Sequence, residues 1–180
     1  AKTVANCFDM GATVSNINPR DESGQRNWKK EIFKEIIDLI KSKRPSILIS
    51  VTTSGRNWSD FERRSECLEL TGDSKPDLAS LTVGSMNFIK TASVNSPEMI
   101  EKLALKMQDN GIKPELEVFE AGMMAKANHL ISNGVIPSEN PYFNILLGSL
   151  GTAPLHPSVF ASFHALLPTN AIWSVAGIGN

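Results

Sequence analysis

Two carboxylates, Glu115 and Glu117, have the greatest chemical potential in this chain because they fall on the same side of one predicted strand. An ionised group held among strands is costly unless a cation, a metal or a ligand meets it. The alternative is that both carboxylates project from an edge strand into water. We favour an enclosed position, because Leu116 and Val118 already occupy the apolar face of the strand. Glu117 is therefore predicted to need a partner.

Hydroxyl side chains gather where other predicted strands end. Thr52 and Thr53 open a loop after one strand, Thr82 lies near the end of the next, and Ser85 follows that end. Hydroxyls and backbone NH groups in such turns can hold a carboxylate or a carbonyl, although ordinary turn chemistry explains any one of them alone. Because several strand ends present donors together, we predict a substrate-binding edge.

The elements that position these residues alternate strictly along the chain. Short β-branched or apolar runs predict six strands, at 13–17, 47–52, 78–83, 115–119, 144–147 and 172–175. Residues with helical spacing predict helices between them, at 28–43, 60–70, 96–110, 122–132 and 157–167. Such alternation implies parallel strands joined by right-handed crossovers, either in an open doubly wound sheet or in a β/α barrel.

Polar residues on one strand parity favour the barrel. In a barrel that parity faces the lumen, while the other parity faces the surrounding helices. No strand is followed by the glycine-rich phosphate turn of a dinucleotide fold. The polar pairs are Asn16 and Asn18, Ser50 and Thr52, and Glu115 and Glu117.

Two helix starts carry capping signals. Ser59 with Glu62 three residues later reads as a capping box, in which each side chain satisfies a free backbone NH at the start of the 60–70 helix. Ser96 followed by Pro97 predicts another helix start.

The composition points to a small-molecule partner. The 180 residues are 41% hydrophobic and 21% charged, which suits one full-sized core and excludes disordered, collagen-like and disulfide-rich chains. Eighteen basic residues face nineteen acidic ones, for a net charge of −1. This balance gives no electrostatic reason to expect nucleic acid or a membrane surface as partner.

The cysteines and histidines indicate ordinary structural roles. Cys7 and Cys67 are expected to be free thiols in a reducing compartment, and without an apolar run or leader the chain is expected to be cytoplasmic. His129, His156 and His164 have no partner at metal-binding spacing, so we expect them to face solvent or to form local hydrogen bonds.

Several segments, in order along the chain, resemble the beta-keto acid cleavage enzymes, whose type member is 3-keto-5-aminohexanoate cleavage enzyme. The segments are Pro19-Arg20-Asp21, Thr52-Thr53, Ser80-Leu81, Gly84-Ser85-Met86-Asn87-Phe88, Gly111 to Phe119, and Trp173 to Gly179. The resemblance implies a zinc-dependent (β/α)8 TIM barrel that converts a β-keto acid and acetyl-CoA to a new CoA thioester and acetoacetate. By position, Thr52 would hold the keto acid, Thr82 would assist, and Glu117 would contact the substrate or order the pocket. Thr53 and Ser85 complete the expected substrate-binding set.

The chain departs from the family pattern in two ways. The family binds its metal with a His-x-His pair, and Asn16-Ile17-Asn18 stands at that position. An Asn amide is a far poorer zinc ligand than imidazole, so zinc is expected only from the resemblance. The family's first and last strands, with further acids, a metal ligand and an Arg, find no counterpart. We therefore expect residues 1–180 to form a single incomplete barrel domain of six strands, a fragment or a chain that needs a partner, such as a homo-oligomer.

Three functional hypotheses follow. The first is an acyl-exchange enzyme, or part of one, whose catalytic residues remain unassigned. The alternative is a non-catalytic relative that serves as a ligand- or partner-binding scaffold. A third, an unrelated barrel lyase or aldolase, would require a Schiff-base lysine, for which Lys90 and Lys113 are the candidates at strand margins.

Overall fold

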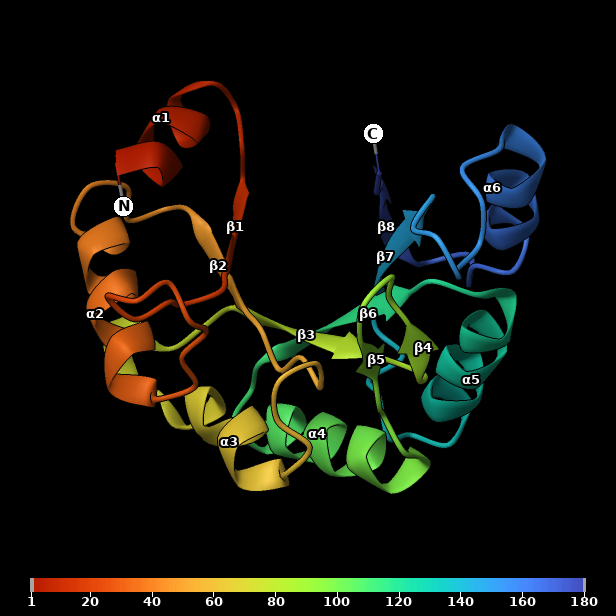
Figure 1. Ribbon diagram of the computed structural model, residues 1–180, viewed down its shortest axis with the longest axis horizontal. Helices are drawn as coiled ribbons and strands as arrows, with labels where there is room; N and C mark the ends of the chain where they lie inside the picture. The colour runs from red at the N-terminus through yellow and green to blue at the C-terminus, as the bar shows by residue number, and fades with distance from the viewer. Residues whose placement is uncertain (1, 180) are drawn as a thin grey trace.

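The computed structural model describes residues 2–179, and its centre is a curled, all-parallel sheet (Figure 1). The strand order β1-β2-β3-β6-β7-β8 follows the chain, and every neighbouring pair is parallel. The six predicted strands are thus confirmed, with ends shifted by up to two residues. Their bounds are β1 (Val14–Ile17), β2 (Leu48–Val51), β3 (Leu78–Thr82), β6 (Lys113–Val118), β7 (Tyr142–Leu147) and β8 (Ile172–Gly177).

The helices cover only the convex side of this sheet, which curves as a half ring open towards the top of Figure 1. This arrangement confirms an incomplete β/α barrel. It rules out the doubly wound alternative, because a doubly wound sheet has helices on both faces. The main helices are α1 (Lys2–Asp9), α2 (Lys30–Lys41), α3 (Phe61–Ser65), α4 (Pro97–Asp109), α5 (Ala121–Ser132) and α6 (Pro157–His164). None of the helices within residues 2–179 is long and apolar enough to cross a bilayer.

The hydrophobic core lies between the sheet and these helices. One strand parity supplies it, as the alternation predicted, and its members are inaccessible to solvent. Burying such side chains contributes roughly 1.5–3 kcal/mol each, which fixes the register and so the direction of the opposite parity. The strand residues are Ile49, Val51, Leu116, Val118, Phe143 and Ile145, and the helix residues include Phe33, Ile37, Leu103, Met107, Met124 and Ala127.

The segment after β2 differs from the prediction. The expected helix 60–70 is divided into α3 and a 3₁₀ helix over Glu66–Glu69. The proposed capping box is wrong, because the N-cap is Asp60, whose carboxylate accepts a hydrogen bond from the backbone NH of Arg63 at 2.9 Å. A carboxylate caps a helix as well as a hydroxyl does, and Asp60 is one residue closer to the first turn.

The helix predicted to start after Ser96 is confirmed, since the Ser96 hydroxyl accepts from the backbone NH of Met99. Between β3 and α4 the chain also forms a small antiparallel hairpin that the pattern did not predict. It pairs β4 (Met86–Asn87) with β5 (Ala92–Ser93). Strands of two residues carry no detectable alternation, and here they serve to fold a loop back over the strand ends.

Candidate functional site

Both glutamates lie on β6, in the middle of the concave wall. In the sheet register Glu115 pairs with Ser80 of β3 and Tyr142 of β7, while Glu117 pairs with Thr82 and Asn144. The structure contradicts the alternative of an edge strand, because β6 has a hydrogen-bonded neighbour on each side. The wall is polar because its residues belong to the parity that the helices leave uncovered.

Glu115 is satisfied by neutral donors alone. It is 5% exposed, and its two carboxylate oxygens accept from the Ser50 hydroxyl at 2.6 Å and the Asn144 amide at 2.7 Å. The network continues, since the Ser174 hydroxyl donates to the Asn144 amide oxygen at 3.1 Å and lies 2.9 Å from the Tyr142 hydroxyl. It therefore links β2, β6, β7 and β8 across the wall, and such a network fixes side-chain positions.

Glu117 is less well compensated. Its carboxylate accepts one hydrogen bond, from the Thr82 hydroxyl at 2.6 Å. Burial raises the pKa of Glu117 to about 7, the Thr82 hydrogen bond opposes this rise, the Glu115 charge adds to it, and the Arg56 charge opposes it. No lysine or arginine among residues 2–179 comes within 4.0 Å of either glutamate. A carboxyl with a pKa near 7 can both accept and donate a proton at neutral pH.

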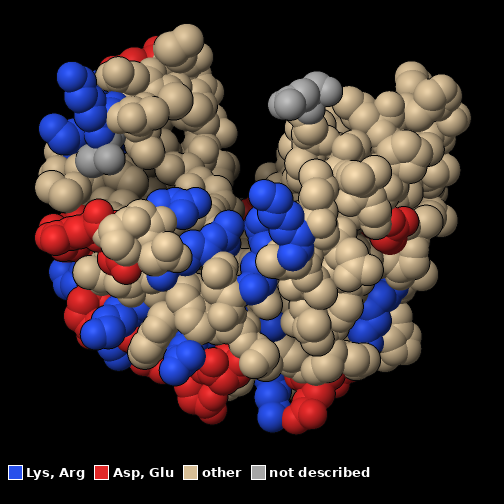
Figure 2. All heavy atoms as spheres, in the orientation of Figure 1, with Lys and Arg blue, Asp and Glu red and all other residues tan. Residues whose placement is uncertain are grey.

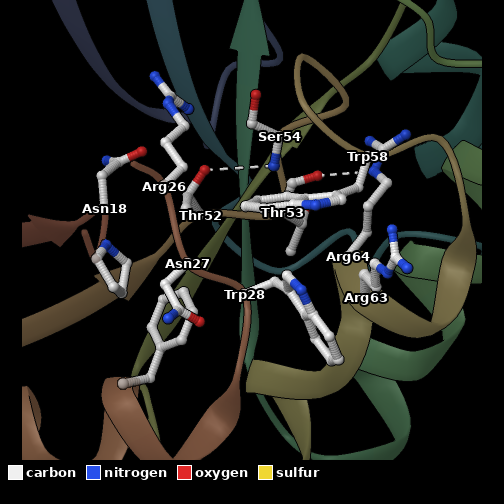
Figure 3. A pocket seen from close by; sticks show the side chains of 12 residues that line it. Asn18, Arg26, Asn27, Trp28, Thr52, Thr53, Ser54, Trp58, Arg63 and Arg64 are labelled. Carbon is white, nitrogen blue, oxygen red and sulfur yellow. Dashed lines mark hydrogen bonds between the residues drawn. The ribbon is translucent and has the colours of Figure 1, made fainter. Parts of the chain in front are cut away.

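The two threonines after β2 have different surroundings. Thr53 is 2% exposed, and its hydroxyl donates to the backbone carbonyl of Ser80, so it holds the turn against β3. Thr52 is half-buried and lines the pocket drawn in Figure 3, where its hydroxyl accepts from the backbone NH of Ser54 at 3.2 Å. The hydroxyl proton of Thr52 is left to donate to a ligand.

The pocket of Figure 3 lies at the carboxyl ends of β1 and β2, where barrel enzymes place their sites. Two indoles and three guanidinium groups contribute to its wall. Its lining comprises Asn18, Pro19, Arg26, Asn27, Trp28, Phe33, Thr52, Thr53, Ser54, Trp58, Arg63 and Arg64.

Arg64 is the buried support of this pocket. It is 4% exposed, and its guanidinium donates to the backbone carbonyls of Thr53 and Val94 and to the Asn95 amide oxygen, at 2.9, 3.3 and 2.6 Å. Burial lowers the pKa of Arg64 to about 10, so it stays charged at neutral pH. Arg64 thereby ties the loop after β2 to the hairpin. Ser85 is part of the same support, since its hydroxyl accepts from the Asn95 backbone NH at 2.8 Å and donates to the Asn95 carbonyl at 3.2 Å.

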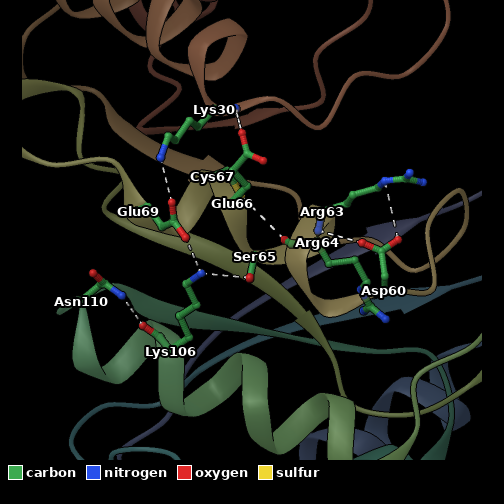
Figure 4. Close-up of polar contacts among 10 residues, drawn as sticks. All are labelled: Lys30, Asp60, Arg63, Arg64, Ser65, Glu66, Cys67, Glu69, Lys106 and Asn110. Atoms are coloured by element: carbon green, nitrogen blue, oxygen red, sulfur yellow. Dashed lines mark hydrogen bonds and ion pairs between the residues drawn. The ribbon is translucent and has the colours of Figure 1, made fainter.

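An ion-pair network outside the barrel holds the segment that carries Arg64 (Figure 4). The Glu69 carboxylate lies 2.8 Å from the Lys30 ammonium and 2.9 Å from the Lys106 ammonium. Lys106 also donates to the Ser65 hydroxyl at 3.0 Å. The network joins α2, the 3₁₀ helix and α4, which fixes the orientation of α3 beneath the pocket.

The residues at the family's metal position do not fit zinc. Asn16 on β1 and Asn18 directly after β1 are both exposed, and the Asn18 amide donates to the Asn16 amide oxygen at 2.6 Å. Two neutral amides, one already hydrogen-bonded to the other, are weak donors for a metal that prefers thiolate, imidazole or carboxylate. Within residues 2–179 no three His, Cys, Asp or Glu side chains converge into a metal-binding group.

The three histidines are exposed, as expected. His156 caps α6 by accepting from the backbone NH of Ser158, and His129 contacts the Asn133 amide.

The structure brings together Thr52, Thr53, Thr82 and Glu117 at one end of the sheet and places Ser85 in the support of the neighbouring loop. Their roles in substrate binding stay predictions. Sequence reasoning missed the polar partners Ser80, Tyr142, Asn144 and Ser174, although strand parity could have found them. It also missed the loop arginines, whose directions no periodicity defines.

Known proteins resemble the chain in sequence and in fold. A family model described as beta-keto acid cleavage enzyme matches residues 1–180. The chain is 31% identical over 175 residues to the 3-oxoadipate:acetyl-CoA acetyltransferase of Cupriavidus necator, covering 96% of this chain and 60% of that protein. It is 30% identical over 181 residues to the 3-keto-5-aminohexanoate cleavage enzyme of Fusobacterium nucleatum, covering 99% of this chain and 64% of that protein. The chain thus spans less than two thirds of the length of these relatives.

The fold is similar to that of ObcA. The apo structure of ObcA superposes with a TM-score of 0.77 and 16% identity, covering 98% of this chain and 48% of ObcA. A ternary complex of ObcA with a C4-CoA adduct and oxalate gives a TM-score of 0.73 over 82% of this chain and 36% of ObcA, at 20% identity.

Proposed function

Because the chain belongs to the beta-keto acid cleavage enzyme family, we propose that it forms the substrate wall of an enzyme that exchanges acyl groups between a β-keto acid and acetyl-CoA. In this reaction the bond between the α and β carbons of the keto acid breaks, and the acyl group passes to the CoA sulfur. The carboxymethyl carbon bonds to the acetyl carbonyl carbon as the bond from that carbon to the CoA sulfur breaks, which gives acetoacetate and frees the sulfur for the new thioester. The observation that carries the proposal is a polar concave wall, with Thr52 and Glu117 at the carboxyl ends of the strands, in a chain whose relatives are named for this chemistry.

The chain's own residues would bind and orient the keto acid. Thr52 has a free hydroxyl proton in the pocket and would donate it to a substrate oxygen. Glu117, with a pKa near 7, would hold or move a proton on the substrate, and the Thr82 hydroxyl would fix its orientation. The Ser50, Glu115 and Asn144 network would keep the wall rigid beside them.

Zinc stays outside this proposal. In the family the metal supplies polarisation of the keto carbonyl, but the amides of Asn16 and Asn18 do not fit the role of zinc ligands.

The same asparagine pair favours a second candidate, a non-catalytic relative that binds small ligands or a partner with the retained wall. Such a protein would keep the pocket and lose the chemistry. The two candidates differ in turnover and not in ligand binding.

The deciding experiment incubates the purified chain with acetyl-CoA and a panel of β-keto acids and measures acetoacetate. Acetoacetate formation that falls in Thr52→Val and persists in Thr169→Val would support the exchange reaction, because Thr169 makes the same change at an exposed position outside the pocket. Ligand binding without acetoacetate would favour the scaffold. Metal analysis of the same sample tests whether zinc accompanies either activity.

We also propose that the chain works in the cytoplasm, where acetyl-CoA is available, and as a homo-oligomer. The second point is supported by β8, an outer strand whose Ile172, Trp173 and Val175 are 53%, 42% and 47% exposed. Light scattering coupled to size exclusion would test it, and a monomer at micromolar concentration would contradict it.

A further inference from the structure

Five of the six arginines gather around the strand ends of β1 and β2. Arg44, the sixth, lies at the opposite end of β2, where its guanidinium pairs with Asp9. Figure 2 shows basic side chains bordering the notch between the two arms of the half-barrel, while most acidic side chains in that view lie towards the periphery. The five are Arg20, Arg26, Arg56, Arg63 and Arg64, and we call them the arginine cluster.

The positive charges of the arginine cluster are nearly uncompensated. Within the described part of the chain, the only carboxylate within 4.0 Å of any of them is that of Asp60, 3.8 Å from Arg63. Burial, then the charges of Arg56 and Arg20, lower the pKa of Arg26, so both of these guanidinium groups repel that of Arg26. Arranging like charges costs free energy that a bound anion recovers.

Neutral contacts hold the cluster in place. The Arg20 guanidinium donates to the carbonyl of Gly24 at 2.8 Å, and the Arg56 guanidinium lies 4.2 Å from the centre of the Phe88 ring. Guanidinium groups positioned in this way keep donors available for a carboxylate, which they bind through two parallel hydrogen bonds.

Part of the cluster shares a pocket with Thr52, because Arg26, Arg63 and Arg64 line that pocket while Arg20 and Arg56 lie outside its lining. Figure 3 shows the indoles of Trp28 and Trp58 between Arg26 on one side and Arg63 and Arg64 on the other, and Thr52 lines the same pocket. The rings offer an apolar surface to a carbon chain, and the guanidinium groups offer an anion site at its end. An anion bound here lies beside Thr52, so it belongs to the keto acid itself rather than to the distant phosphate end of an extended acyl carrier.

We propose that the arginine cluster binds a second carboxylate at the far end of the substrate, so that this chain selects acidic β-keto acids over neutral or cationic ones. The inference rests on the proposed function for the keto acid, and it makes an independent statement about the ligand's charge. The cluster attracts a distal carboxylate and repels a distal ammonium, and selectivity draws on both effects.

The test uses three unreactive six-carbon acids that differ only in the distal group: adipate, hexanoate and 6-aminohexanoate. Binding to the wild-type chain is measured by calorimetry and by tryptophan fluorescence. Adipate is expected to bind roughly tenfold to a hundredfold more tightly than hexanoate, with 6-aminohexanoate weakest, because a charged hydrogen-bonded pair contributes about that factor. The preference should shrink as salt rises. Equal affinities, or no binding of any of the three, would overturn the proposal.

Variants locate the effect. Arg26→Gln and Arg56→Gln should each remove most of the preference for adipate, and Arg44→Gln, the same change at the far end of β2, should leave it intact. Circular dichroism checks that each variant is folded. The comparison of the three ligands on the wild-type chain tests the proposal even if a variant does not fold. A preference for adipate that survives in both Arg26→Gln and Arg56→Gln would refute the assignment.

A further arm separates the two sources of negative charge. Adenosine 3′,5′-bisphosphate represents the phosphate end of CoA. If it binds through the same arginines and adipate does not, the cluster binds the phosphate groups of CoA and not the keto acid. Failure of the proposed function is distinguishable as well. An arginine-dependent preference for adipate without acetoacetate from any keto acid would uphold the anion site and reject the exchange reaction.

Discussion

The titration of Glu117 makes the folded chain less stable as the pH rises. Burial raises its pKa to about 7, against 4.5 for an ordinary glutamate. A raised pKa means that the folded chain binds the proton more tightly than the unfolded chain does. The stability from the neutral carboxyl is therefore fully present below about pH 4.5 and is lost as the pH rises through about 7.

The size of this loss follows from the interval between the two pKa values. At about 1.4 kcal/mol for each pH unit, the interval from 4.5 to about 7 corresponds to roughly 3 kcal/mol. Glu117 keeps some contact with solvent, which screens its charge, so this figure is an upper bound. A domain with a total stability of about 5–15 kcal/mol would register such a change clearly.

The substitution Glu117→Gln removes the titrating group and keeps the shape of the neutral acid. Urea unfolding of both proteins, followed by tryptophan fluorescence between pH 4.5 and 8.5, measures the difference in free energy of unfolding. We expect the two proteins to be of similar stability at pH 4.5 and the Gln variant to be the more stable by up to about 3 kcal/mol at pH 8.

Glu98→Gln provides the matched control with the opposite sign. Glu98 is exposed, and the hydrogen bond from Lys102 lowers its pKa, so its contribution is present above the ordinary pKa and is lost as the pH falls. Parallel stability curves for wild type and Glu117→Gln across the whole range would refute the reasoning, since they would mean that the Glu117 carboxyl titrates equally in both states.

Two further predictions test the surroundings of the site. Thr82→Val removes the hydrogen bond that lowers the pKa of Glu117, so it should raise that pKa above about 7. Thr82→Ser keeps the hydroxyl and should return the pKa to its wild-type value. Carbon NMR of the glutamate carboxyls measures the pKa in both variants. Gly55→Ala should destabilise the chain by about 1–3 kcal/mol, because the added methyl group would lie 2.9 Å from the Arg64 guanidinium and 2.7 Å from the backbone oxygen of Val94. Gly122→Ala, in a helix with open space around it, should instead stabilise the chain by about 0.5–1 kcal/mol, as measured by urea unfolding. If the two glycine substitutions changed the free energy of unfolding in the same direction, this account would be contradicted.

Strand parity made the fold and the glutamate wall predictable from the sequence. A period of two requires every second residue of a strand to share a face, so the buried Leu116 and Val118 determine where Glu115 and Glu117 point. The same rule would have predicted Tyr142 as a wall residue beside Asn144, had the predicted strand 144–147 been extended back to residue 142.

Loop residues follow no such rule. Arg26 and Arg56 lie in irregular segments after β1 and β2, and only the three-dimensional fold brings their charges within reach of each other. The role of Arg64 was not predictable for another reason. The spacing of apolar residues predicts a helix there, but it does not show that one arginine turns inward to donate to backbone carbonyls. The Asn16 and Asn18 contact likewise depends on side-chain rotation, which spacing leaves open.

The arginine cluster and the titrating glutamate are coupled through Arg56, whose charge lowers the pKa of Glu117. An anion bound to Arg56 neutralises that charge, so the pKa of Glu117 must rise and the carboxyl must take up a proton from solution as the ligand binds. Calorimetry of adipate binding near pH 7, in buffers of different ionisation enthalpy, measures this uptake directly. We expect a fractional proton taken up by the wild-type chain and almost none by Glu117→Gln. Uptake that is equal in the two proteins would assign the proton to another group and uncouple the anion site from the glutamate.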